Sequence, residues 1–141
     1  TKVFKYADIH HILHYEKGEN GKIGTTKHPS FFLEGQEFVA MDGAEPHKFT
    51  FNESISFVVN CKTQEEIDYF WEKLWEEGEK GQCGWLKDKF NLSWQIVPDI
   101  LDKMLQDKDA NKSENLMKAI FQMKKIDIET LRQVYKEKVS L

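Results

Sequence analysis

The chain has 141 residues, enough for one domain that buries a core without help from disulfide bonds or metal ions. Its 20 basic and 24 acidic side chains give a net charge of −4, and Arg132 is the only arginine. Nucleic-acid-binding proteins usually need a basic face and use arginine to contact bases and phosphates, so we expect no nucleic-acid partner. Apolar runs are short, such as Phe31 to Leu33, so we expect no membrane-spanning segment.

The sequence predicts a cytoplasmic protein. Thr1, Lys2 and Lys5 are not followed by the apolar stretch of a secretory signal. Cys61 and Cys83 are too few for a disulfide framework, which favours a reducing compartment.

Strands are predicted in the first third of the chain. His10 to Tyr15 is an extended segment, and residues 16–22 form a loop whose Asn-Gly pair favours a turn. Ser30 to Leu33 and Phe38 to Met41 are predicted to form a hairpin around residues 34–37.

The clearest strand of the sequence runs from Ser54 to Cys61, because its side chains alternate. One face is apolar and is predicted to pack on a helix: Ile55, Phe57, Val59 and Cys61. The other face is small and largely polar, which is typical of a cavity wall: Ser54, Ser56, Val58 and Asn60.

A helix is predicted directly after this strand. Thr63 to Glu66 has the pattern of a capping box, and Gly78 is a stop signal. The helix carries apolar residues at the spacing of one helical face: Ile67, Phe70, Trp71 and Leu74. A second hairpin follows, with strands Trp85 to Lys87 and Ser93 to Val97.

The remainder of the sequence is predicted to be helical. Pro98 to Gln106 and Ser113 to Met123 both carry apolar residues at helical spacing. Asp127 is predicted to cap a final helix, in which Ile126 and Leu131 are placed for a hydrophobic staple.

Residues 82–98 read QCGWLKDKFNLSWQIVP. This stretch resembles the CGWLKDKFGLSWQIVP motif of the PhnB-like family, which is also called 3-demethylubiquinone 3-methyltransferase-like. The resemblance extends from about Tyr15 to Tyr135. Asn91 stands where the family usually has Gly, and Asn also tolerates a positive φ, so the turn should be kept.

The resemblance implies the vicinal-oxygen-chelate superfamily, which includes glyoxalase I, bleomycin-resistance proteins and extradiol dioxygenases. The implied fold is α+β, with paired βαβββ modules whose cupped sheets enclose a small-molecule cavity, usually in a dimer. We interpret the chain as a single glyoxalase-like domain, 1–141. Its parts are a first module at 1–53 that reads as incomplete, a second module at 54–98 and a helical extension at 99–141. Residues 1–53 contain no helix like the one predicted after Thr63, so the opening strand and helix of the first module are either absent from this chain or differ from the family. The incomplete module would leave a strand edge for a partner chain, so we predict a homodimer.

Metal-dependent members of the superfamily bind a divalent ion, and the resemblance places two of their ligand positions at Ser54 and Gln95. Neither side chain is an anion, and a serine hydroxyl is a poor ligand for Zn, Ni or Fe. We therefore expect no metal and no other cofactor. Ser54 and Gln95 either bind a ligand in the cavity or hydrogen-bond one another across the sheet.

Three histidines lie close together at His10, His11 and His14. They match the HExxH metal motif only weakly, because His11 replaces its Glu. In a strand, His10 and His14 would be about 13 Å apart. Together with Tyr15, His14 could instead line the mouth of the cavity.

The hypothesis with most support is a protein that binds an unknown small molecule without a metal. The predicted ligand-binding residues are His14, Tyr15, Ser54, Ser56, Asn60, Trp85 and Gln95. The alternatives are a metal-dependent lyase, isomerase or dioxygenase whose ligands come from His10 or His14 across a dimer, and a structural dimerisation module. Methyl transfer is not expected, because no Gly-x-Gly turn for S-adenosylmethionine is present.

Overall fold

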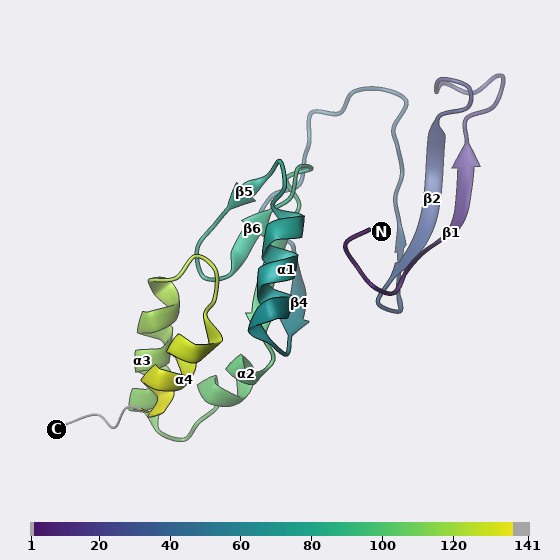
Figure 1. Cartoon of the computed structure of the whole chain (residues 1–141). Coiled ribbons are helices and arrows are strands. Elements are labelled where there is room, and N and C mark those ends of the chain that lie inside the picture. The colour runs from purple at the N-terminus through teal and green to yellow at the C-terminus, as the bar shows by residue number, and fades with distance from the viewer. Residues whose placement is uncertain (1, 137–141) are drawn as a thin grey trace. The chain divides into compact units, whose positions relative to one another are not determined.

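The computed structural model describes residues 2–136 and has a mixed α+β fold (Figure 1). The chain divides into two compact units, Thr1–Thr50 and Phe51–Leu141. The described residues contain two sheets and four helices, which confirms the predicted α+β class. No described helix has the length and apolar character needed to cross a bilayer.

The first unit is an antiparallel sheet in the order β1-β2-β3. Its strands are β1 (Ala7–His14), β2 (Thr26–Leu33) and β3 (Gln36–Val39). As predicted, its described residues form strands and loops without a helix. Among them only Ser30 is buried, so this unit has no apolar core of its own.

The first hairpin differs from its prediction in the length of its turn. Residues 34–37 were expected to connect the strands, but Glu34 and Gly35 alone do so, with φ angles of 49° and 84°. Two consecutive positive φ angles are the geometry of a tight two-residue turn, which matches the twist of its strands. The strand predicted over Phe38 to Met41 is therefore β3, at Gln36–Val39.

The second unit contains a four-stranded sheet in the order β4-β7-β6-β5. Its strands are β4 (Ser56–Cys61), β5 (Glu79–Lys80), β6 (Trp85–Lys87) and β7 (Ser93–Pro98). β4 pairs in parallel with β7, whereas the other pairs are antiparallel. With α1 between β4 and β5, the order of elements is βαβββ, as the sequence predicted.

β4 begins two residues later than predicted. Both the amide and the hydroxyl of Ser54 donate to the side-chain oxygen of Asn52, which folds this segment into a local turn instead of a ladder. Ile55 was expected on the helix-facing side, but it is 67% exposed because it precedes the strand. Cys61 is fully buried, as expected for that face.

Helix α1 (Gln64–Leu74) covers one face of this sheet (Figure 1). The Thr63 hydroxyl accepts a hydrogen bond from the Glu66 amide at 3.3 Å, as the capping motif predicts. The Glu66 carboxylate in turn accepts from the amide of Lys62, one residue before the usual partner. The apolar side chains packed between helix and sheet are fully or nearly fully buried: Ile67, Trp71, Leu74, Leu86, Trp94 and Ile96.

The C-terminal part contains α2 (Ile100–Leu105), α3 (Ala110–Phe121) and α4 (Ile128–Lys136). α3 begins three residues before the predicted Ser113, because the Asp109 carboxylate caps the helix by accepting from the Asn111 amide. Asp127 accepts from the Thr130 amide at 2.6 Å, which confirms the predicted cap of α4. The helices share one core cluster: Leu116, Ile120, Ile126 and Leu131.

The side chain of Gln64 attaches these helices to α1. Its amide nitrogen donates to the Ile126 carbonyl at 3.1 Å, and its oxygen accepts from the Ile128 amide at 2.9 Å. An ion pair between Asp68 and Lys125 at 2.6 Å lies beside it. The Gln64 amide thus pairs backbone groups just before and at the start of α4.

A second attachment joins the helices to the sheet at the turn before β6. The amides of Cys83 and Gly84 donate to the carbonyls of Met123 and Lys124, both at 2.7 Å. Gly84 has a φ of 82°, and a Cβ atom there would lie 2.7 Å from the Ile96 carbonyl oxygen. Only glycine allows the turn and β7 to approach this closely.

Substituting Gln64 tests how much this attachment stabilises the second unit. Gln64→Ala removes both bonds to the start of α4, and we expect it to lower the free energy of unfolding by about 1–3 kcal/mol. Lys73→Ala, on the exposed face of the same helix, should change it by less than about 0.5 kcal/mol. Urea unfolding followed by tryptophan fluorescence measures both. Equal effects of the two substitutions would contradict the attachment.

Candidate functional site

The face of the second sheet opposite α1 is the open face of this unit. Side chains alternate along each strand, so those that do not point toward the α1 core lie on this face. They are Ser56, Val58 and Asn60 of β4, Trp85 and Lys87 of β6, and Ser93, Gln95 and Val97 of β7. Val58 is 52% exposed, whereas the α1 side of the same sheet is closed.

A cavity of about 170 Å³ lies at one end of this sheet, near its β5 edge. Glu53, Glu79, Gly81, Trp85, Leu86, Lys87 and Ser93 line it. Ser93 is 1% exposed, and its hydroxyl has no hydrogen-bond partner. Buried hydroxyls nearly always have a partner, because burying one without a bond costs about 1–3 kcal/mol. The cavity is therefore a place where a ligand atom could supply that bond.

Charged side chains surround this cavity. Lys87 forms an ion pair with Glu53 and lies opposite Glu79 in the pairing of β5 with β6. The hydrogen bond between Lys87 and Glu53 raises the pKa of the lysine and lowers the pKa of the carboxyl group. The ionisable side chains of the lining are thus two glutamates and one lysine.

Two predicted site residues meet on the open face. The side-chain amide of Gln95 donates to the hydroxyl of Ser56 at 2.8 Å. One sequence-based alternative had Gln95 bonding Ser54 across the sheet. The partner in that alternative is wrong, because Ser54 lies before β4 and donates instead to Asn52.

The other predicted site residues lie in different places. Trp85 lines the cavity and stands opposite Gln95 in the β6–β7 pairing, and Asn60 lies on the open face at the far end of β4. His14 and Tyr15 belong to the first unit, where the Tyr15 hydroxyl donates to the Asp42 carbonyl at 2.7 Å.

The three histidines His10, His11 and His14 lie in β1, as the strand prediction required. His10 packs edge-on against Phe32 with ring centroids 6.0 Å apart. Across residues 2–136, no group of three or more His, Cys, Asp or Glu side chains is placed to hold a metal ion.

Sequence reasoning did not single out Ser93, Lys87, Glu53 or Glu79 as site residues. One observation could have pointed to Ser93: the alternation of residues 93–97 places it on the same face as Gln95, a predicted site residue. The burial of Ser93 could not be deduced from this spacing.

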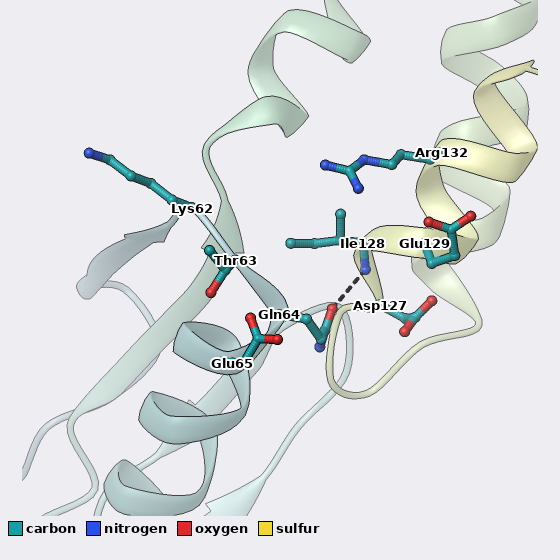
Figure 2. Close-up of a pocket in the computed structure, with 8 residues that line it drawn as sticks. All are labelled: Lys62, Thr63, Gln64, Glu65, Asp127, Ile128, Glu129 and Arg132. Atoms are coloured by element: carbon teal, nitrogen blue, oxygen red, sulfur yellow. Dashed lines mark hydrogen bonds between the residues drawn. The ribbon is translucent and has the colours of Figure 1, made fainter.

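A larger cavity of about 340 Å³ lies where the starts of α1 and α4 meet (Figure 2). Its lining is Lys62, Thr63, Gln64, Glu65, Asp127, Ile128, Glu129 and Arg132. Figure 2 shows Gln64 reaching Ile128 across it, and Thr63 and Asp127 cap their own helices. No buried polar side-chain atom of its described lining lacks a partner, so we consider the open-face cavity the better candidate.

Comparisons with known proteins agree with the family resemblance. Residues 1–97 match the family described as 3-demethylubiquinone-9 3-methyltransferase, and the match ends within β7. The structure is similar to a PhnB protein from Bacillus cereus, with 37% identity over 70% of this chain and 84% of that chain and a TM-score of 0.65. A comparison with curated proteins finds no significant match.

Two further solved structures have lower TM-scores. A protein from Pseudomonas aeruginosa is 18% identical over 52% of this chain and 65% of its own, with a TM-score of 0.43. A protein from Staphylococcus aureus is 26% identical over 68% of this chain and 77% of its own, with a TM-score of 0.25.

The two cysteines should differ sharply in reactivity. Burial raises the pKa of the Cys61 thiol to about 12, whereas Cys83 is partly exposed. At pH 8 only roughly one in ten thousand Cys61 thiols is ionised, and the thiolate is the nucleophile. We expect iodoacetamide to modify Cys83 and not Cys61 in the native protein, as read by peptide mass spectrometry. Both should react in urea, and equal native modification would contradict the buried position of Cys61.

Proposed function

The chain belongs to the PhnB-like, 3-demethylubiquinone-9 3-methyltransferase family, and on this basis we propose that it binds a small organic molecule in the open-face cavity without a metal ion. The observation that carries the proposal is the buried Ser93 hydroxyl without a partner in the cavity wall. The setting that we propose is a vicinal-oxygen-chelate fold, which the family resemblance implies, in a cytoplasmic protein.

The donors around the cavity support binding without a transition metal. The lining includes neither histidine nor cysteine, and one of its carboxylates, Glu53, is already paired with Lys87. Zn, Ni and Fe favour imidazole, thiolate and free carboxylate ligands. A hydroxyl, an indole and a charged pair are better suited to hydrogen bonding and stacking with an organic ligand.

The family description names a methyltransferase, but methyl transfer is not part of this proposal. The sequence has no Gly-x-Gly turn. The cavity, at about 170 Å³, is smaller than the roughly 300–1,000 Å³ of sites for drug-sized ligands. It resembles in volume a cavity that holds one benzene ring, which sets the size of the ligand group it would enclose.

A screen of small polar compounds in the presence of EDTA tests this function. A ligand at a hundredfold excess over its Kd should raise the free energy of unfolding by about 2.7 kcal/mol, and thermal unfolding detects this. We expect Trp85→Leu to abolish the shift, and Phe90→Leu, at the exposed turn outside the cavity, to keep it. Stabilisation that survives Trp85→Leu, or that is seen only when EDTA is left out, would contradict the proposal.

The partner we propose is a second copy of the chain. In this view residues 1–53 are the remainder of a first module, 54–98 are the second module and 99–141 are an extension. The first unit supports this, because among its described residues β1 is an edge strand with exposed apolar side chains at Ile9 and Leu13. Such a strand invites pairing with another chain.

Light scattering after gel filtration tests the dimer. We expect twice the mass of one chain, and Ile9→Lys should shift the equilibrium toward the monomer because it places a charge on the apolar part of β1. Phe90→Lys changes a residue that is also exposed but lies in the second unit, so it serves as the control and should leave the mass unchanged. A monomeric unmodified chain would refute this arrangement.

A further inference from the structure

Three features of the open-face cavity identify the class of ligand, and this inference rests on the function proposed above. We infer that the cavity binds the ammonium group of a small organic cation, which donates to the Ser93 hydroxyl and is compensated by Glu53 and Glu79. The features are the surplus of negative charge in the lining, the unpartnered hydroxyl and the indole of Trp85.

The charges of the lining favour a cation over an anion. Lys87 is the cation of the lining, and it is paired with Glu53 and faces Glu79 across the β5–β6 ladder. An anionic ligand would have to displace Glu53 from Lys87 and would be repelled by Glu79. A cationic ligand balances the surplus carboxylate and leaves the Lys87–Glu53 pair in place.

The Ser93 hydroxyl fits a ligand that carries N–H donors. A serine oxygen accepts hydrogen bonds, and an ammonium group offers up to three donors. Because Ser93 is 1% exposed, a bond made there would be shielded from water and therefore stronger than one at the surface. A single bound ammonium group would thus satisfy the one buried hydroxyl of the cavity.

Trp85 supplies the third element. Tryptophan offers the best aromatic surface for a cation, because the face of its ring carries partial negative charge, and the contact strengthens as water is excluded. Trp85 is half-buried and lines the cavity beside two carboxylates. The carboxylates would attract the ammonium group by charge, and the indole ring would contact it through its face, so not every N–H group needs a carboxylate partner.

Three probes of similar size separate the possibilities: benzylammonium, benzyl alcohol and benzoate. Each carries one ring, which matches the volume of the cavity, and they differ in charge. Titrations at pH 7 and low salt, followed by amide NMR shifts of Trp85, Lys87 and Ser93, report binding at this site. We expect benzylammonium to bind about tenfold more tightly than benzyl alcohol and benzoate to bind most weakly, an order that follows from charge.

Charge-neutralising variants locate the effect. Glu79→Gln should weaken benzylammonium binding about fivefold and leave benzyl alcohol unchanged, because only the cation senses the lost charge. Glu76→Gln makes the same change at an exposed position outside the cavity and should have no effect. Both residues are exposed, so the fold should tolerate either substitution.

The outcomes distinguish this inference from the proposed function. If benzoate or benzyl alcohol binds at these amides as tightly as benzylammonium, the cavity is a ligand site but the ammonium assignment is wrong. Unchanged benzylammonium affinity in Glu79→Gln would also overturn the assignment. If none of the three probes shifts these amides, both the assignment and the proposed cavity fail.

Discussion

The parallel pairing of β4 with β7 is the constraint on which the second unit depends. Parallel neighbours need a long crossover, and the connection from β4 to β7 consists of α1, which covers the apolar face of the sheet, followed by β5 and β6. The same pairing aligns Ser56 with Ser93 in register and brings Gln95 close enough to donate to Ser56. Because α1 covers the apolar face of the sheet, the same strand pairing leaves these polar side chains together on the opposite, open face.

The two faces of this sheet have different roles: the α1 side stabilises the fold, and the open side carries the candidate binding site. On the α1 side, Trp71, Leu86 and Ile96 are almost completely buried, and burial of such side chains is the main stabilising term of a small domain. On the open side, the buried hydroxyl of Ser93 remains without a partner at a cost in free energy. The burial of apolar side chains on the α1 side can offset this cost in folding free energy. Buried polar groups without a partner are expected mainly at functional sites.

Most of the second unit could be predicted from the periodicity of its apolar residues. The alternation of residues 56–61 fits only a strand, and the spacing of Ile67, Trp71 and Leu74 fits only a helix. Family resemblance correctly identified the positive φ of Asn91, which is 64°. Boundaries set by side-chain capping were missed by a few residues, as at Ser54. The candidate site was harder to predict, because Glu53, Glu79 and Ser93 are brought together by strand pairing between segments distant in sequence, which local patterns do not encode.

The pairing of β4 with β7 also has a consequence for synthesis on the ribosome. The first unit consists of neighbouring hairpins, whose contacts are local and can form as soon as its strands emerge. The second sheet must wait for Pro98, the last residue of β7, which pairs with Cys61. A nascent chain would thus expose the apolar edge of β1 well before the second unit closes, which makes this interval the one in which aggregation competes with folding.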